Sequence, residues 1–434
     1  MKTLDVPRFR AKRRHIKPLS ERPDVVIIAL IMSKEFILDF FGIGNIVNAL
    51  LCVLIVLRLI LYRWRMPLPA ILSALITPTL FVAAIIMDGA VLIALKNVLR
   101  IAQLQVYALY ILFLFREQRR SVIKMYNDSG TLFNAILIIN SVAMLIQYHY
   151  PGIIQAASDG TPISFEDNIS GFFGYGSTHA VGYYVVFVII YNIGWCQRVQ
   201  KNKKVLLALY TGLITIASLY IGSLNDNKAL FFIMAIAAVI MCVYIGSHHI
   251  KAAAITAAIV IPLTIIVTTI AYITLPSFRA FVDKIAWSID FVVVRAMSPD
   301  AIVNGSDERF KLVVYSLILP CSWLLGEGFG AADMYQPGFH GFNHFGQNDY
   351  GTIIILGGVW IYLALVASYT YTISSATDEK WPRKIIAVIP LVLYIVASTI
   401  YVQVFSQVRI GLPFLLLGIG LALIYNQQKS TFKR

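Results

Sequence analysis

The sequence has little charge. Of its 434 residues, 13% are Asp, Glu, Lys or Arg and 59% are hydrophobic. Soluble proteins carry about a quarter charged residues, so a soluble globular protein is excluded. The chain instead contains repeated apolar runs of eighteen or more residues, and each is long enough to cross a hydrocarbon core of about 30 Å. The composition therefore predicts an all-α polytopic membrane protein.

Cysteines are few, and features of a signal peptide are missing. The four cysteines are scattered along the chain, so we expect no disulfide framework. The N-terminal segment is the basic, hydrated stretch MKTLDVPRFRAKRRHIKPLSERPD, and the first apolar segment has no small-residue cleavage site. We therefore expect no cleaved signal peptide.

Apolar runs between charged or Pro/Gly-rich breaks predict twelve membrane spans. A basic arm (1–23) precedes nine spans (24–274), a long loop (275–350) follows them, and three further spans (351–426) lead to a short tail (427–434). The loop is far longer than a connection requires, and loops of that size are usually functional. The predicted spans are 24–42, 44–63, 67–87, 91–115, 131–149, 179–197, 204–222, 229–247, 252–274, 351–373, 384–404 and 409–426.

The distribution of basic residues predicts the orientation. If the N-terminus is cytoplasmic, 25 of the 36 Lys and Arg residues lie in the arm, the inner loops and the tail, and seven lie in outer segments. This positive-inside pattern places both termini in the cytoplasm and the loop 275–350 outside. The net charge of +14 then indicates contact with anionic membrane lipids and not with nucleic acid. The apolar segment 310–325 is short for a span, and we expect it to lie at the membrane interface.

Two cations stand one helical turn apart in the fourth predicted span. Arg100 is costly in a membrane and should face the bundle interior or a polar cavity. Together with Lys96 it suggests contact with an anion. Lys96 is close to the outer end of the span, where snorkelling to the head groups explains it.

A first outer cluster of polar residues precedes the sixth predicted span. It reads GFFGYGSTHAVGYY, and its glycines let a ligand approach the backbone while Ser177 and His179 offer hydrogen-bonding groups. The alternative is an ordinary helix start capped by Ser177 or Thr178.

A second cluster is the short outer turn SLNDNKALFF, in which Lys228 opens the eighth predicted span. One interpretation is an anion site made by this lysine and the free N–H groups of the helix start. The other is a lysine that snorkels to the head groups or pairs with Asp226.

The third cluster lies in the long loop. It contains Arg309 in NGSDERFKLVV, then LLGEGFGAADMY, then GFHGFNHFGQNDYG with His340 and His344. Two histidines four residues apart suit a metal on a helix, but the neighbouring glycines disfavour a helix and a third ligand is missing. A proton-handling histidine beside cationic anion binders fits better. The alternative is a solvated loop in which the histidines have no catalytic or binding role.

In this arrangement the chain resembles the bacterial O-antigen polymerase and O-antigen ligase superfamily. SGFFGYGSTHAVGYY resembles the family's glycine-rich start of a middle span, and GSLNDNKALFF occupies the place of a Ser-Arg turn, with Lys228 where the family has arginine. The loop resembles the family's loop in Arg309, in the bend LGEGFG and in FNHFGQNDYGTIIILGG, although the order Asn343-His344 is reversed. Asp349-Tyr350-Gly351 looks more like the capsule and exopolysaccharide polymerases than like the lipid A–core ligases.

The resemblance implies a GT-C-like glycosyltransferase of the bacterial inner membrane that needs neither a metal nor a cofactor. Its donor would be an undecaprenyl-diphosphate-linked oligosaccharide, and a chain-length regulator would be a partner protein. Transfer by direct displacement would invert the anomeric configuration. The residues implied are His344, or else His340, as the base, with Asp349 as a further catalytic residue; Arg309, Lys228 and Arg100 at the diphosphate; and Ser177, His179, Asn343 and Tyr335 at the sugars.

The sequence thus predicts a polymerase that joins lipid-linked repeat units outside the inner membrane. A ligase that moves finished glycan to lipid A–core or another acceptor is the nearest alternative. A flippase for lipid-linked oligosaccharides is a third. A flippase should show repeated halves and charges through the bundle, whereas this sequence shows no internal repeat and sparse intramembrane charge.

Overall fold

We describe the fold from a computed structural model of the whole chain. The residues that it describes are 22–33, 36, 43–68, 70–71, 75, 90–151, 169–174, 177–198, 201–225, 227–246, scattered positions between 262 and 286, 312–313, 316–317, 323–334, 348–377, 383–406, 411, 415–416 and 418–423.

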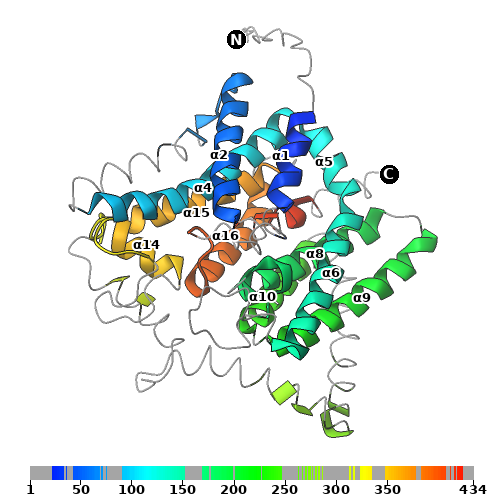
Figure 1. Ribbon diagram of the computed structural model, residues 1–434. Helices are drawn as coiled ribbons and strands as arrows, with labels where there is room; N and C mark the ends of the chain where they lie inside the picture. The colour runs from blue at the N-terminus through cyan, green and yellow to red at the C-terminus, as the bar shows by residue number, and fades with distance from the viewer. Residues whose placement is uncertain are drawn as a thin grey trace, which may run out of the picture.

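Every regular element within those ranges is helical (Figure 1). Four helices contain stretches long and apolar enough to cross a membrane, at Val91–Glu117, Gly130–His149, Thr178–Cys196 and Lys203–Leu224. The protein is thus all-α, as its composition predicts, while the number of twelve spans stays a prediction. The helices are α1 (Arg22–Ser33), α2 (Gly44–Leu61), α4 (Val91–Glu117), α5 (Arg119–Asp128), α6 (Gly130–His149), the short η3 (Gly171–Phe173), α8 (Thr178–Arg198), α9 (Lys201–Leu224), α10 (Lys228–Gly246), α14 (Asp349–Gly357), α15 (Val359–Ser374) and α16 (Arg383–Tyr401).

The helix bounds follow the apolar runs closely. α2, α4, α6, α8 and α10 begin and end within two residues of the predicted spans. The predicted span 351–373 consists of two helices, α14 and α15, which meet at Gly358. The spans predicted at 67–87, 252–274 and 409–426 lie in large part outside the described residues. Within the predicted interfacial segment 310–325, positions 312–313 and 316–317 are helical.

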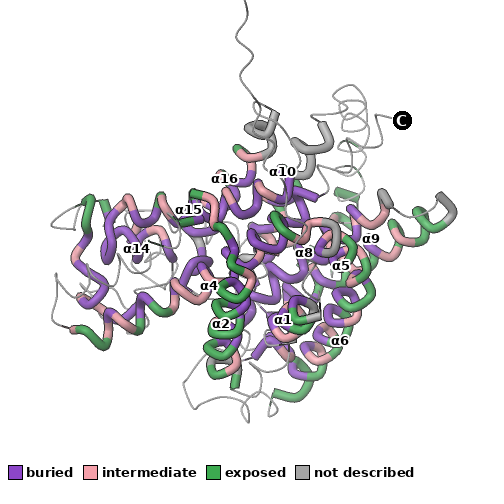
Figure 2. Tube along the Cα trace, turned by 90° about the horizontal axis from the view of Figure 1, so that it is seen from above, coloured by how far each residue is buried: buried purple, intermediate pink, exposed green. Residues whose placement is uncertain are grey.

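The helices pack in two groups. α6, α8, α9 and α10 contact one another, and α14, α15 and α16 form a second group, to which α4 is joined through α15 and α2 through α4. α10 contacts α16 and so connects the groups (Figure 1). Burial follows this arrangement, because α8 is buried along most of its length while α2 and α9 show exposed faces (Figure 2). The exposed faces are apolar, as contact with lipid requires.

A buried polar network joins the start of α1 to the ends of α2 and α4. Arg58 donates from Nη2 to Oδ2 of Asp24 at 2.7 Å and from Nε to Oδ1 at 3.0 Å. Tyr110 and Gln118 donate to the same carboxylate at 2.8 and 2.9 Å. A buried charge needs such complete pairing, because an unpaired one costs several kcal/mol, about 3–5 when a partner is removed.

A second polar connection ties α4 and α5 to the end of α15. Arg116 donates to the hydroxyl of Tyr371 at 2.7 Å, and Arg119 donates to the carbonyls of Ser375 and Ala376 at 3.2 and 2.7 Å. A cation at a helix C-terminus satisfies carbonyls that have no partner within the helix. The predicted topology places the start of α1 and the ends of α2, α4 and α15 on one side of the membrane, and these ends lie together in the fold.

The chain turns sharply after α2. The N–H of Arg63 donates to the carbonyl of Ile60 at 2.9 Å and that of Trp64 to the carbonyl of Leu59 at 3.3 Å, which is the pattern of a Schellman cap. Arg63 has a φ of 51°, in the left-handed region where glycine is usual, and a side chain there costs about 1 kcal/mol or more.

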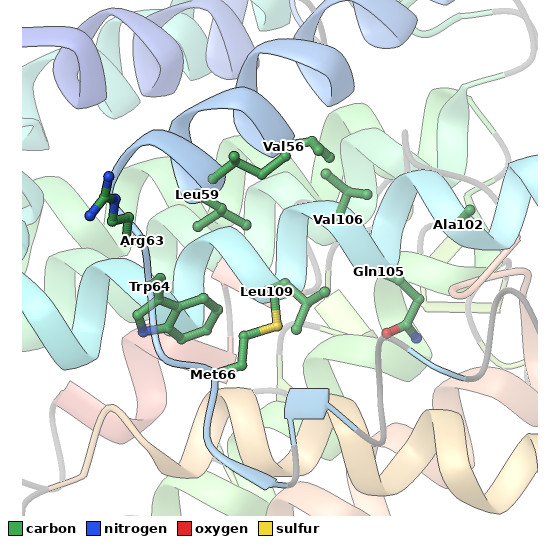
Figure 3. A pocket seen from close by; sticks show the side chains of 10 residues that line it. Val56, Leu59, Arg63, Trp64, Met66, Ala102, Gln105, Val106 and Leu109 are labelled. Carbon is green, nitrogen blue, oxygen red and sulfur yellow. The ribbon is translucent and has the colours of Figure 1, made fainter.

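This turn closes one end of a groove between α2 and α4, a cavity of about 410 Å³ (Figure 3). Most of its lining is apolar. The lining residues are Val56, Leu59, Ile60, Arg63, Trp64, Met66, Ala102, Gln105, Val106 and Leu109.

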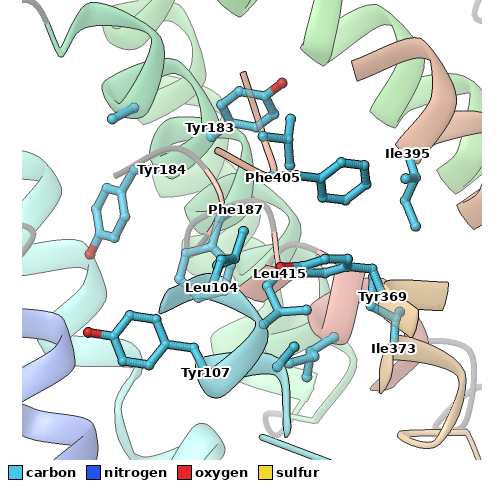
Figure 4. Packing of buried hydrophobic residues seen from close by; sticks show 14 of the residues in the cluster. Leu104, Tyr107, Tyr183, Tyr184, Phe187, Tyr369, Ile373, Ile395, Phe405 and Leu415 are labelled. Atoms are coloured by element: carbon cyan, nitrogen blue, oxygen red, sulfur yellow. The ribbon is translucent and has the colours of Figure 1, made fainter. Parts of the chain in front are cut away.

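Aromatic side chains fill the junction between the two groups of helices (Figure 4). The ring of Phe405 lies 4.8 Å from that of Tyr369 and 6.2 Å from that of Tyr362, measured between centroids. Phe405 belongs to the irregular stretch 402–406 that follows α16. Irregular backbone at membrane depth is tolerated where protein buries it, and this stretch is buried throughout.

Candidate functional site

The first polar cluster begins with a turn that is fixed to α6 by two side-chain amides. Asn140 accepts from the N–H of Phe172 at 2.8 Å, and Gln147 accepts from the N–H of Gly171 at 2.8 Å. Gly171 has a φ of 63°, and a Cβ there would stand 2.4 Å from Oδ1 of Asn140. The turn therefore requires glycine, and it sets the position at which α8 begins.

Ser177 and His179, both predicted to contact sugars, lie at the start of α8. Ser177 is buried and directly precedes the helix, where its carbonyl accepts from the N–H of Val181 at 3.2 Å. His179 is partly buried one residue inside the helix. Asn227 of the second cluster donates to the carbonyl of Thr178 at 2.5 Å, so the first two clusters are in direct contact.

The second cluster has the structure of a capped helix start. Oδ1 of Asn227 accepts from the N–H of Leu230 at 3.0 Å, which makes Asn227 the N-cap of α10. Asn225 donates to the carbonyl of Ile169 at 3.1 Å. Lys228 is thereby fixed as the first residue of α10, beside the start of α8. The positive ends of two helix dipoles thus lie together at this place.

The third cluster contributes a segment that we call the strap, residues 323–334. It crosses the junction of α14 and α15. The N–H groups of Glu327 and Gly328 donate to the carbonyls of Ile355 and Leu356 at 2.7 and 2.9 Å. The strap thus satisfies the last carbonyls of α14, which a continuous helix would have used itself.

Glycine makes the close approach of the strap possible. Gly358 has a φ of 82°, and a Cβ there would lie 1.7 Å from the carbonyl oxygen of Leu324. On the strap side Gly326 has a φ of 70°, and its Cβ would meet the backbone around Leu356 at 2.7 Å. The bend LGEGFG and the pair Gly357-Gly358, separate motifs in the sequence, are therefore two sides of one contact.

The other side of the strap binds the beginning of α4. Asn97, which is completely buried, donates to the carbonyls of Phe329 and Ala332 at 2.9 and 2.7 Å and accepts from the N–H of Met334 at 3.3 Å. One amide thereby holds three backbone groups of the strap.

Arg100 and Lys96 meet the strap at a shared carboxylate. Lys96 forms an ion pair with Asp333, and Nη1 of Arg100 lies 3.6 Å from the same side chain. The side chain of Asp333 is 5% exposed, against 47% for Lys96 and 27% for Arg100. Arg100 faces a polar partner, as its cost in lipid predicts. Lys96 also has a partner in the loop, while its exposed side chain near the predicted outer end of the span leaves the snorkelling explanation as a prediction.

Asp349, predicted as a further catalytic residue, is buried at the start of α14. Its carboxylate accepts from the N–H of Phe405 and from the hydroxyl of Ser406, the latter at 2.6 Å. Asn348, the N-cap, accepts from the N–H of Gly351 at 2.7 Å. In this geometry Asp349 holds the irregular stretch 402–406 against α14, which is a positioning contact between two segments.

The structure brings together Ser177, His179 and the helix that Lys228 opens, and it gives Arg100 a partner in the long loop. The remaining predicted site residues lie outside the described residues; they are Arg309, Tyr335, His340, Asn343 and His344. Within the described ranges no three His, Cys, Asp or Glu side chains form a group that could hold a metal ion.

Sequence reasoning missed the polar residues that hold the clusters in place. Asn97, Asn140 and Gln147 are polar residues within long apolar runs, and that placement is a signal, because a polar group in lipid is costly unless it is bonded. The sequence gives no indication of the segments to which they bond.

The chain matches no protein-family model, no curated protein and no solved structure. The function is therefore inferred from the residues and their geometry.

Proposed function

We propose that the protein is a polysaccharide polymerase that joins undecaprenyl-diphosphate-linked oligosaccharide repeat units on the outer face of the bacterial inner membrane. The observation that carries the proposal is the contact between the strap and α4. It attaches the long polar loop to Lys96 and Arg100, two cations in the outer half of a predicted span.

The chemistry requires cations and a base. A lipid-linked diphosphate becomes a good leaving group when positive charges stabilise the charge that develops on it. Lys228 stands at a predicted outer helix start, Arg100 lies further inside α4, which begins at Val91, and Arg309 belongs to the same loop as the strap. A histidine of the loop, His344 or else His340, would remove the proton of the acceptor hydroxyl as it attacks the anomeric carbon.

The remaining predicted residues would contact the sugars. Ser177 and His179 offer a hydroxyl and an imidazole at the start of α8, and Asn343 and Tyr335 are residues of the long loop. The contact of Asn227 with Thr178 supports this assignment, because it joins the start of α8 to the helix that Lys228 opens.

Complementation of a bacterial strain that lacks its own polymerase tests the proposal. Arg309→Ala and His344→Ala should leave the protein in the membrane at the wild-type level and abolish the polymer ladder on a gel. Single repeat units should accumulate on the lipid carrier. Arg279→Ala is the matched control, since Arg279 also lies in the predicted outer segment and bonds to the carbonyls of Tyr272 and Ile273.

The carrier-linked product separates the alternatives. Single repeat units on the carrier support a polymerase, while full-length polymer that is not attached to its final acceptor identifies a ligase. A wild-type ladder in both variants would contradict the assignment of the site.

A further inference from the structure

We propose that the groove between α2 and α4 binds an anionic phospholipid of the cytoplasmic leaflet, with one acyl chain along the groove and the phosphate at Arg63 and Arg65. This site is independent of the proposed glycosyl transfer. On α4 it begins at Ala102, after the residues Lys96, Asn97 and Arg100 that contact the strap, and none of its residues belongs to the predicted catalytic loop.

The groove has the properties of a site for a hydrocarbon chain. It runs along α4 from Ala102 to Leu109, about 10 Å at 1.5 Å per residue. Seven of the ten lining residues are aliphatic or methionine. Val56 and Ile60 are 42% and 63% exposed on its outer wall, so a chain can enter from the lipid phase.

One end of the groove carries charge. Arg63 stands at that end, and its guanidinium points away from the apolar side chains (Figure 3). Arg65 follows two residues later and is exposed. Neither arginine has an acidic partner in the part of the chain that the structure describes. Two cations beside an apolar groove complement a ligand with an anionic head and a hydrocarbon tail.

Hydrocarbon contact by itself gives little preference in a bilayer, because the lipid tails that surround the protein are equally apolar. Preference comes from the head group. The neighbouring aromatic residues Tyr62 and Trp64 are of the kind that gathers at the head-group level. The positive-inside pattern assigns this end of α2 to the cytoplasmic leaflet, where anionic lipids attract basic residues. The occupant is therefore a phospholipid of that leaflet.

Fluorescence quenching tests the site in the full-length protein. The protein is placed in vesicles of phosphatidylcholine with a minor share of phosphatidylglycerol, and bromine is carried on the chains of only one of the two lipids at a time. Brominated chains quench tryptophan on contact. The chain has six tryptophans, so the quenching that is lost in Trp64→Phe reports the groove.

We expect brominated phosphatidylglycerol to quench Trp64 beyond its share of the membrane. Arg63→Gln and Arg65→Gln should each lower this preference about fivefold, the factor that corresponds to ~1 kcal/mol for each cation near an anionic surface. Ala102→Leu, which narrows the groove and keeps both charges, should reduce quenching of Trp64 by both lipids.

Lys124→Gln is the matched control. Lys124 is an exposed cation of α5 on the same predicted side, and it does not line the groove, so its loss should leave the preference unchanged. Quenching of Trp64 by each lipid in proportion to that lipid's share of the membrane in the wild type would overturn the proposal. An effect of Lys124→Gln as large as that of Arg63→Gln would also overturn it, since general surface potential would then be the cause. Displacement of the brominated lipid by inorganic phosphate would show an anion site that needs no chain, and this too would contradict the proposal.

Discussion

Asn97 is completely buried and bonds to three backbone groups of the strap, at residues 329, 332 and 334. Its place in the apolar run of α4 is visible in the sequence. Its partners are more than 230 residues away, and no periodicity or composition connects positions so distant. The sequence therefore predicts that a polar residue in this apolar run is energetically costly. It does not predict the hydrogen bonds that offset the cost.

Asn97→Ala should destabilise the protein by about 2–3 kcal/mol, because each lost hydrogen bond of a buried group costs about 1 kcal/mol. The thermal unfolding midpoint in detergent measures the loss, and limited proteolysis should show faster cleavage within residues 323–334. Asn127→Ala is the control, because Oδ1 of Asn127 has no hydrogen-bond partner in the described part of the chain. Equal midpoints for the two variants would contradict the role of Asn97.

Arg63→Gly should have opposite effects on stability and on lipid preference. Glycine removes the cost of the left-handed conformation at φ 51°, so the midpoint in a neutral detergent should rise by the equivalent of about 0.5–1 kcal/mol. The preference for phosphatidylglycerol should fall as in Arg63→Gln. A variant that is destabilised in neutral detergent would show that the Arg63 side chain holds the turn itself.

At the scale of single helices, the sequence predicted the positions and lengths of the elements best. The apolar runs predicted the bounds of α4 and α10 because a span must keep a length of about 20 apolar residues. The break between α14 and α15 was not predicted, because IIILGGVWIYL reads as one continuous run. Gly358 ends α14 because the strap is also present. The N–H groups of the strap donate to the carbonyls of Ile355 and Leu356, which therefore need no partner in a continued helix.

Gly358→Ala tests this break. The φ of 82° and the 1.7 Å approach to the carbonyl oxygen of Leu324 should together destabilise the protein by about 3 kcal/mol, from backbone strain and from overpacking. Gly212→Ala is the matched control in α9, because a Cβ at Gly212 would have nothing within 4 Å. That variant should be neutral or more stable by up to about 1 kcal/mol. Similar unfolding midpoints for the two variants would contradict the account of the junction.

At the scale of the whole molecule, helix ends are sorted in the way that the predicted topology requires. The ends joined through Asp24 and Arg58 belong to the side predicted as cytoplasmic. The turns held by Asn140, Asn225 and Asn227 belong to the side predicted as outer. The alternation of basic and less basic loops predicted this sorting, because each membrane crossing moves the chain to the other side and so fixes the side on which every helix end lies. It could not predict that the first two polar clusters touch, since that depends on how α8 packs against α10.

The proposed function depends on the side of the molecule that is predicted to be outer, where Arg100 meets the loop through Asp333. The sequence singled out Arg100 because of its cost in lipid, and the structure supplied the carboxylate that it faces. The loop histidines His340 and His344 lie outside the described residues, so their proposed role as the base rests on the sequence. Chemistry on a lipid-linked substrate is thus the claim that unites the strap, the cations and the predicted base.

Reconstitution tests that claim most directly. The purified protein is placed in vesicles with synthetic undecaprenyl-diphosphate-linked repeat units and a metal chelator, and the products are analysed by mass spectrometry. We predict new glycosidic bonds of inverted configuration between repeat units, with one undecaprenyl diphosphate released for each bond and no loss of rate in the chelator. Intact lipid-linked units that cross the bilayer without any new bond would contradict the account and identify a flippase.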